Sequence, residues 1–121
     1  AWREGAPAPR LRLRHAAAAA LGGELMVVLG GRDADDAIVR AVDVYNATAD
    51  AWMTPLSNWT GAASDWGAFA IEAWPTLGAA TVVAVGGYDA GYTSLAAAQT
   101  LVVAPDGQFD AALPAGTEVL Q

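Results

Sequence analysis

The chain contains only two asparagines, and each begins an acceptor triplet for N-linked glycosylation. Asn46 stands in Asn-Ala-Thr and Asn58 in Asn-Trp-Thr. Such triplets carry glycans where they lie on exposed loops of secreted proteins. Asn46 follows an apolar segment that ends at Tyr45, and Asn58 lies in a connecting segment, so both are expected at the surface. We therefore expect an extracellular or secretory-pathway protein. A cytoplasmic location is the alternative, because asparagine also favours turns by itself.

A second group of polar residues lies in two loops, each of which follows a Gly-Gly pair. The aspartates of the first loop are spaced like a loose calcium loop, but the central glycine and terminal glutamate of that motif are missing. The second loop carries two tyrosines, a residue type that suits protein interfaces and stacks on sugars. We predict that both loops form an interaction surface. The candidate residues are Arg32, Asp33, Asp35, Asp36, Tyr88, Asp89 and Tyr92.

Residues for catalysis are scarce. The chain has no cysteine, which excludes disulfides, thiolate catalysis and cysteine-based zinc sites. His15 is the single histidine, and one histidine supplies neither a metal site nor a catalytic triad, so we expect it packed or hydrogen-bonded in a strand. Ser57, Ser64 and Ser94 have no plausible base nearby in the sequence. We predict no catalytic residue, no cofactor and no metal site.

Composition narrows the classes of partner. The 121 residues are 55% hydrophobic and 16% charged, with a formal net charge of −7 and no lysine. This composition predicts a packed core within one domain or part of one. The acidic balance argues against nucleic acid and anionic membrane surfaces as partners. The longest apolar stretch, residues 16–31, contains Glu24 and four glycines, so no membrane span is predicted.

Short apolar runs rich in valine, bounded by glycine, predict a chain made of strands. The run of alanines at residues 16–20 has high helix propensity. We nevertheless predict a strand there, because the run lacks an N-cap and leads through a Gly-Gly turn into a clear strand. Each set of four strands is expected to form one antiparallel sheet. The predicted strands are 10–20, 24–29, 38–45 and 50–53, then 67–73, 79–85, 96–103 and 108–112.

The two halves of the chain repeat the same order of residues. Gly30-Gly31 and Gly86-Gly87 are 56 residues apart, and an apolar run precedes each pair. A polar loop, a second run, an aromatic residue and a proline follow in both halves. In this alignment Tyr45 matches Val103, Trp52 matches Phe109 and Pro55 matches Pro114, while Trp2 matches Trp52 from an earlier unit. We predict the end of a preceding unit at 1–9, units at 10–56 and 57–114, and a lead into a further segment at 115–121.

The first unit resembles the kelch repeat, the four-stranded blade of a kelch β-propeller. The residues that carry the resemblance are Arg12, His15, Gly30, Gly31, Tyr45 and Trp52. The second unit keeps the Gly-Gly pair but lacks the Arg and His and has Phe109 in place of Trp. The resemblance implies an all-β fold of two four-stranded antiparallel blades, in which the motif residues are scaffold and Trp52 is buried between the sheets. Propellers close with about four to eight blades, so a segment of a larger propeller is expected.

The resemblance also implies a function. We expect a non-enzymatic binding or assembly module of an extracellular or cell-surface glycoprotein. Its expected partners are proteins or further blades of the same propeller, with a glycan as another candidate. One alternative is an intracellular kelch adaptor, which a glycan on Asn46 would exclude. Another is a structural segment of a secreted galactose-oxidase-like enzyme, whose Tyr–Cys crosslink and His ligands would have to lie outside this chain.

Overall fold

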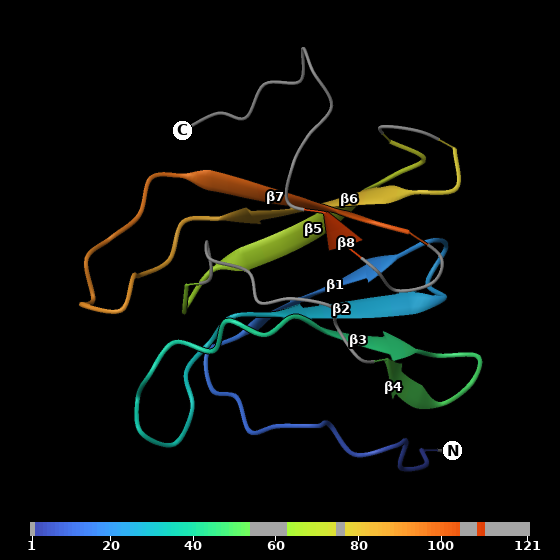
Figure 1. The fold of residues 1–121 in the computed structure, drawn as a ribbon, viewed down its shortest axis with the longest axis horizontal. Coiled ribbons are helices and arrows are strands. Elements are labelled where there is room, and N and C mark those ends of the chain that lie inside the picture. Colours follow the sequence, from blue (N-terminus) through green and yellow to red (C-terminus); the bar gives the residue numbers. More distant parts are fainter. Residues whose placement is uncertain (1, 54–62, 75–76, 105–108, 111–121) are drawn as a thin grey trace.

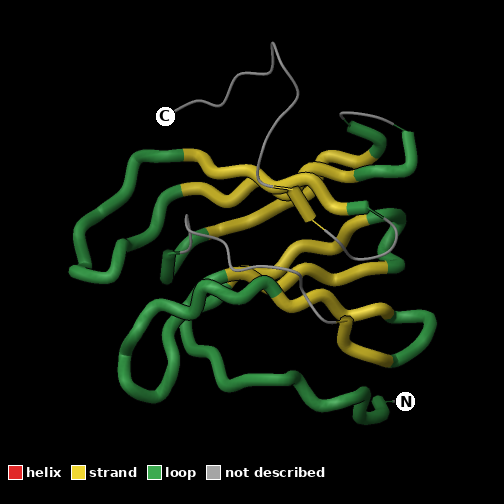
Figure 2. Tube along the Cα trace, in the orientation of Figure 1, coloured by secondary structure: helices red, strands yellow, loops and turns green. Residues whose placement is uncertain are grey.

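The computed structural model describes residues 2–53, 63–74, 77–104 and 109–110, and these form two antiparallel sheets without any helix (Figures 1 and 2). In each sheet the strands follow one another in chain order, so every neighbour is joined by a simple reversal of the chain. The first sheet contains β1 (Ala16–Ala20), β2 (Leu25–Leu29), β3 (Asp43–Asn46) and β4 (Ala51–Met53). The second contains β5 (Gly67–Glu72), β6 (Ala80–Val85), β7 (Ala98–Val103) and β8 (Phe109–Asp110).

The prediction of an all-β chain with two sets of antiparallel strands is confirmed, including the alanine run. β1 pairs with β2 along its whole length, from Ala16 opposite Leu29 to Ala20 opposite Leu25. Its alternate alanines are buried, with Ala20 fully inaccessible. Burial on one face with period two is the geometry of a strand, and this packing overrides the helix propensity of alanine.

Six of the strands begin within two residues of the predicted position, but two begin five or six residues later. The strand predicted at 10–20 begins only at Ala16, because Arg14 has a left-handed backbone with φ of 59° that interrupts the extended conformation. Before it, Leu13 makes a single bridge to Arg32. The strand predicted at 38–45 begins at Asp43, and Ile38 also makes only an isolated bridge to Arg32. These bridges still hold the segments beside the sheet.

The two sheets stack face to face around a common core (Figure 1), but they use opposite faces of their equivalent strands. In β2 the core residues stand one, three and five positions before the Gly-Gly pair. In β6 they stand two, four and six positions before it. Like units stacked in one direction must meet in this way, because the front of one contacts the back of the next. The core residues concerned are Leu25, Val27 and Leu29 in β2 and Ala80, Val82 and Ala84 in β6.

The tryptophan between the sheets is not the one predicted. Trp66 is 7% exposed, and its indole N–H donates to the Leu29 carbonyl across the interface at 3.3 Å. Trp52 instead lies half-buried on the outer face of the first sheet, where it packs on Tyr45 with ring centroids 5.2 Å apart. The expectation that Trp52 is buried between the sheets is therefore wrong. Trp2, which matches Trp52 in the sequence, is fully exposed.

The strand register corrects one position of the repeat. Met26 in β2 pairs with Tyr45, and the residue 56 positions later, Val82 in β6, pairs with Leu101. Leu101, which is fully buried, therefore occupies the Tyr45 position, two residues before the predicted Val103. Both sheets lie within the predicted units 10–56 and 57–114. Pro55, Asn58 and Pro114 lie outside the described residues.

Candidate functional site

The loops that follow the two Gly-Gly pairs have the same backbone structure. Asp33 N–H donates to the carbonyl four residues on at 2.9 Å, and Asp89 N–H does so at 3.0 Å. The Oδ1 atom of each aspartate accepts from the backbone N–H groups two and four residues on, at 2.9–3.0 Å. Aspartate favours such loops because its carboxylate satisfies these donors. Asp33 and Asp89 therefore build the loops.

The second glycine of each pair lets the lead-in segment of its own sheet pass close by. Gly31 and Gly87 have φ of 82° and 84°, a region that side chains rarely adopt. A Cβ at Gly31 would collide with the Leu13 carbonyl, and one at Gly87 would collide with the Ser64 carbonyl. Both loops lie at the same end of the molecule, on the left of Figure 1.

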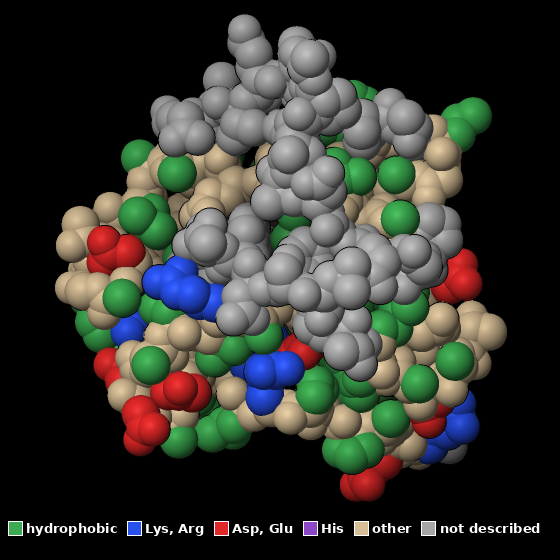
Figure 3. All heavy atoms as spheres, viewed as in Figure 1, with side chains coloured by type: hydrophobic (Ala, Val, Ile, Leu, Met, Phe, Trp, Pro, Cys, Tyr) green, Lys and Arg blue, Asp and Glu red, His purple; other side chains and the backbone are tan. Residues whose placement is uncertain are grey.

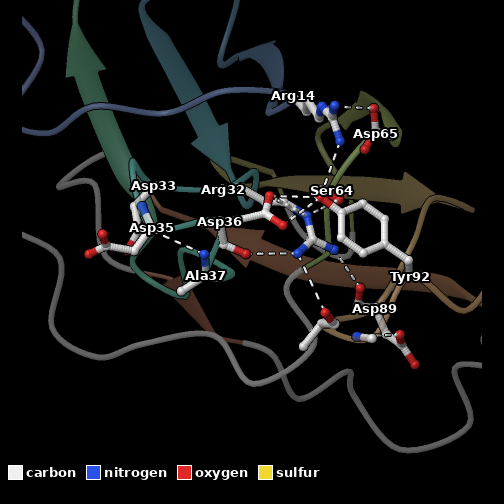
Figure 4. A network of polar contacts seen from close by, with 12 residues as sticks. Arg14, Arg32, Asp33, Asp35, Asp36, Ala37, Ser64, Asp65, Asp89 and Tyr92 are labelled. Atoms are coloured by element: carbon white, nitrogen blue, oxygen red, sulfur yellow. Dashed lines mark hydrogen bonds and ion pairs between the residues drawn. The ribbon is translucent and has the colours of Figure 1, made fainter.

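A buried arginine joins the two loops (Figure 4). Arg32 is 2% exposed, and its Nε donates to Ser64 Oγ at 3.0 Å. Its Nη1 donates to the Asp36 carbonyl at 2.9 Å in its own loop, and its Nη2 donates to the Asp89 carbonyl at 2.7 Å in the other loop. The planar guanidinium suits such a fan of fixed acceptors. Arg32 was predicted to be an interaction residue, but its buried side chain connects the two loops instead of facing solvent.

Tyr92 covers this arginine. The Arg32 guanidinium carbon lies 3.7 Å from the centroid of the Tyr92 ring, a cation–π contact. The Tyr92 hydroxyl donates to the Asp36 carboxylate at 2.7 and 2.8 Å, and this hydrogen bond raises the pKa of Tyr92. Arg14 donates to the same hydroxyl at 3.3 Å and lies 3.9 Å from the Asp65 carboxylate. The two loops are thus linked through side chains as well.

The exposed part of this region is acidic and aromatic. We call residues 33–37 and 88–93 the loop surface. The Asp36 side chain is 61% exposed, Asp35 is exposed, and the rings of Tyr88 and Tyr92 meet at 6.2 Å between centroids. Acidic and basic side chains gather at this edge of the molecule in the space-filling view (Figure 3). The loop surface can therefore offer carboxylates and phenol rings to a partner.

Of the seven predicted residues, the structure brings four into one network: Arg32, Asp36, Asp89 and Tyr92. Asp33 holds the backbone of its own loop, while Asp35 and Tyr88 are exposed beside the network. Three further members were missed: Arg14, Ser64 and Asp65. They belong to the lead-in segments of β1 and β5, which are distant from the loops in the sequence. No sequence signal pointed to them, because the bridges that bring these segments to the loops, Leu13 to Arg32 and Ser64 to Tyr88, are formed only in the folded chain.

A second ionic cluster lies on the outer face of the first sheet. Asp43 is buried and accepts from Arg10 at 2.7 and 3.1 Å and from Arg12. Arg12 also donates to the Gly30 carbonyl at 2.7 Å. Burial lowers the pKa of Arg12, although its contacts with Asp43 oppose that shift. The cluster ties the lead-in of β1 to β2 and β3, a scaffold role that agrees with the match of Arg12 to the repeat motif.

Ser64 and His15 are two of the remaining candidate groups for catalysis, and the structure describes both. No group of three or more His, Asp or Glu within the described parts of the chain could hold a metal ion. Ser64 accepts from Arg32, which is not a base. His15 is exposed beside a cavity of about 390 Å³, so the expectation that it packs in a strand is wrong. No helix that is long and apolar enough to cross a membrane occurs in the described residues.

The first glycosylation triplet lies at the opposite end of the molecule from the loop surface. Asn46 is the last residue of β3 and is half-buried, and its Oδ1 accepts from Ala49 N–H at 3.0 Å across the β3–β4 turn. Thr48, the hydroxyl residue of the triplet, is exposed. A glycan here would leave the loop surface open. Asn58 is outside the described residues.

No protein-family model matches the chain, and neither does any curated protein. The functional argument therefore depends on the two sheets and the loop surface.

Proposed function

We propose that this chain is a non-enzymatic binding module, made of two blades of a kelch-like β-propeller, that binds a basic protein segment through the loop surface. One observation carries the proposal: Arg32 connects equivalent loops from the two sheets through its bonds to Asp36 and Asp89. A surface built from two repeats and held rigid loses little entropy when it binds.

The repeat geometry supports the propeller part of the proposal. Both sheets have four antiparallel strands in chain order, and both have a Gly-Gly pair with positive φ after the second strand. The sheets also stack front to back, as blades around an axis do. The triplet at Asn46 supports an extracellular or cell-surface glycoprotein, with an intracellular adaptor as the alternative.

The chemistry of the loop surface favours a basic partner. Within residues 33–37 and 88–93 the exposed charges are the carboxylates of Asp35 and Asp36, and the Arg32 guanidinium is buried beneath Tyr92. The half-exposed Arg14 beside them is already bonded to the Tyr92 hydroxyl and lies near the Asp65 carboxylate. Arginine side chains bind carboxylates in pairs of hydrogen bonds and stack on phenol rings, so they match both features. The exposed tyrosines, Tyr88 at 39% and Tyr92 at 45%, supply the area that interface hot spots need.

Binding of a short labelled peptide of alternating arginine and serine tests the proposal by fluorescence anisotropy. We expect saturable binding that weakens by about threefold or more in Asp35→Asn and further in Tyr88→Ala. A glutamate–serine peptide of the same length should not bind.

Glu24→Gln is the matched control, because it removes the same charge at the β1–β2 turn, at the other end of the sheet. Equal weakening in Glu24→Gln and Asp35→Asn would mean that only the net charge attracts the peptide, and the loop surface would be rejected. Absence of binding at low salt, where charge attraction is strongest, would reject a basic partner.

A further inference from the structure

The contact between the two sheets has a socket and a plug. The socket is the Gly-Gly pair after β2: Gly31 N–H donates to the Ala63 carbonyl at 2.8 Å, and a Cβ at Gly30 would collide with that carbonyl and with the Trp66 ring. The plug is the lead-in segment of β5, residues 63–66. Asp65 N–H also donates to the Arg14 carbonyl at 2.8 Å. The second sheet is thus locked to the first at a position that only glycine allows.

No described residue fills the equivalent socket on the second sheet. Gly86 has φ of 73°, close to the 62° of Gly30, but the nearest atom to a Cβ there would be the Leu95 carbonyl oxygen at 3.9 Å. The Gly87 N–H has no partner among the described residues, whereas its equivalent Gly31 has one. Val85 is 47% exposed, whereas its equivalent Leu29 is fully buried. Within the part of the chain that the structure describes, the second sheet therefore has the backbone conformation of the filled socket but no segment packed into it.

The face around the empty socket is apolar. Phe69 is 52% exposed and Ile71 42%, and together with Val85 they lie on the face of the second sheet that points away from the first. The side chains on this face of β5, β6 and β7 carry no charge. Contiguous exposed apolar side chains of this kind mark an interface.

A matching plug exists at the other side of the molecule. The second glycine of each pair shows which lead-in residues are equivalent. A Cβ at Gly31 would meet Leu13 and His15, and a Cβ at Gly87 would meet Ser64 and Trp66. Leu13 is therefore equivalent to Ser64, and His15 to Trp66. The plug of the first sheet is therefore residues 12–15. Its His15 is exposed beside the cavity of about 390 Å³.

The outer face of the first sheet also carries apolar side chains beside this plug, next to the Arg10–Arg12–Asp43 cluster that lines the same cavity. The same cavity is lined by Ala17, Met26 and Val28, and Met26 is 36% exposed. Met26 and Val28 in β2 are equivalent to Val82 and Ala84 in β6, the residues through which the second sheet contacts the first. The N-terminal segment lies over this face but is hydrogen-bonded near β4, through Ala6 to Asp50 and Trp52.

We propose that copies of this chain associate head to tail, with the exposed face of the second sheet of one copy on the outer face of the first sheet of the next. His15 fills the socket at Gly86, and Gly87 N–H donates to the Arg12 carbonyl, as Gly31 donates to Ala63 within one chain. The proposal rests on the repeat relation between the two sheets. The occupant is a second copy because the contact then repeats the interface that already joins the two sheets.

Analytical ultracentrifugation of residues 1–121 and of two variants tests this contact. Val85→Glu places a charge on the face that carries the socket, and Met26→Glu places one on the face that carries the plug. We expect the wild type to form species of more than one copy, and each variant alone to associate at least about tenfold more weakly. The mixture of the two variants should form a one-to-one complex, because each retains the face that the other lacks. A contact between identical faces would not give that result.

Leu77→Glu is the control, since Leu77 is 90% exposed in the β5–β6 turn, away from both faces, and the variant should associate like the wild type. A monomeric wild type, unchanged association of Val85→Glu, or a mixture without the one-to-one complex would each overturn the proposal. Peptide binding by Val85→Glu should remain intact, which separates a failure of this contact from a failure of the loop surface.

Discussion

At the scale of single residues, backbone conformation and burial decide what each side chain can do. Arg32 has the side chain of a binding residue, but its donors are used by Ser64 and by carbonyls of both loops. Moving the guanidinium outward would break its bond to the buried Ser64 hydroxyl and its bonds to the partly buried carbonyls, which costs more than an exposed arginine could gain. Gly30 at the sheet contact is likewise determined by its surroundings, because a side chain there would collide with the second sheet.

Gly30 and Gly86 give a matched pair of substitutions. Both have positive φ, so alanine at either should cost about 1–2 kcal/mol of backbone strain. Gly30→Ala should cost about 1–3 kcal/mol more, because its Cβ would collide with Ala63 and Trp66. Among the described residues, a Cβ at Gly86 would meet only the Leu95 carbonyl oxygen, at an ordinary contact distance of 3.9 Å. Urea unfolding of both variants as monomers measures the difference. Equal losses of stability in Gly30→Ala and Gly86→Ala would contradict the structure of the sheet contact.

Asn46 is expected to carry a glycan in protein made through a eukaryotic secretory route. The β3–β4 turn exposes Thr48, and the turn lies away from the loop surface, so a bulky sugar fits there. Intact-mass spectrometry before and after deglycosylation measures occupancy, and Asn46→Gln and Asn58→Gln assign it. An unmodified Asn46 in protein from the native source would favour the intracellular adaptor.

At the scale of elements, the β3–β4 hairpin anchors the N-terminal segment. The Asp50 carboxylate accepts from the Tyr45 hydroxyl and from Ala6 N–H at 2.8 Å, and Trp52 Nε1 donates to the Ala6 carbonyl at 3.0 Å. The hydrogen bond from Tyr45 lowers the pKa of Asp50, with help from Ala6, and the same bond raises the pKa of Tyr45. One tyrosine–aspartate pair thus links two strands and a lead-in segment.

This pair should give the stability a defined pH dependence. A carboxyl whose pKa is lower in the folded state adds stability above its unfolded pKa of about 4, and that stability is lost as pH falls through the folded value. The stability difference between wild type and Asp50→Asn should therefore shrink as pH falls from about 5 to 2. Urea midpoints across that range measure it. A difference that stays constant or grows on acidification would contradict the assignment.

At alkaline pH the stability contribution of Tyr45 changes in the opposite direction, because it is lost as pH rises. A raised pKa of Tyr45 means that its stability contribution is full below the unfolded pKa of about 10 and is lost as pH rises through the folded value. Tyr45→Phe is the control at both ends of the range, because it removes the hydrogen bond and keeps the ring that packs on Trp52.

At the scale of the whole molecule, the two sheets share one core and depend on each other. Core residues of both sheets form a single cluster, and Trp66 lies where the sheets meet. A domain of this size buries a modest share of its surface, so neither sheet has the core to fold alone. The stacking of unlike faces is what makes the two repeats one unit.

Substitution of Trp66 by alanine should therefore lower the stability more than the same substitution of Trp52. Trp66→Ala removes a buried side chain from the sheet contact and should cost about 3–5 kcal/mol in one cooperative transition of both sheets. Trp52→Ala should cost only about 1–2 kcal/mol, because the side chain is half-exposed on the outer face. Denaturant titration followed by far-ultraviolet circular dichroism measures both. A larger loss in Trp52→Ala than in Trp66→Ala would contradict the arrangement of the sheets.

Most of the local structure could be predicted from the sequence. Valine runs and glycine pairs indicated the order of the eight strands, and the spacing of 56 residues indicated the repeat. The aspartates and tyrosines after the glycine pairs indicated the two loops and six of the candidate residues that either build them or lie exposed in them: Asp33, Asp35, Asp36, Tyr88, Asp89 and Tyr92. These features depend on φ preferences and hydrogen bonds over a few residues, so the local sequence is sufficient to determine them.

Only the tertiary structure decided which face of each strand is buried. β2 and β6 alternate alike around their glycine pairs, yet one buries Leu29 and the other exposes its equivalent Val85. The packing of the two sheets also buries Trp66 in the core, leaves Trp52 on the outer face and buries Arg32 between the loops. A strand with apolar residues on both sides has no local preference between its faces. The neighbour against which it packs makes that choice, and that neighbour is distant in the sequence.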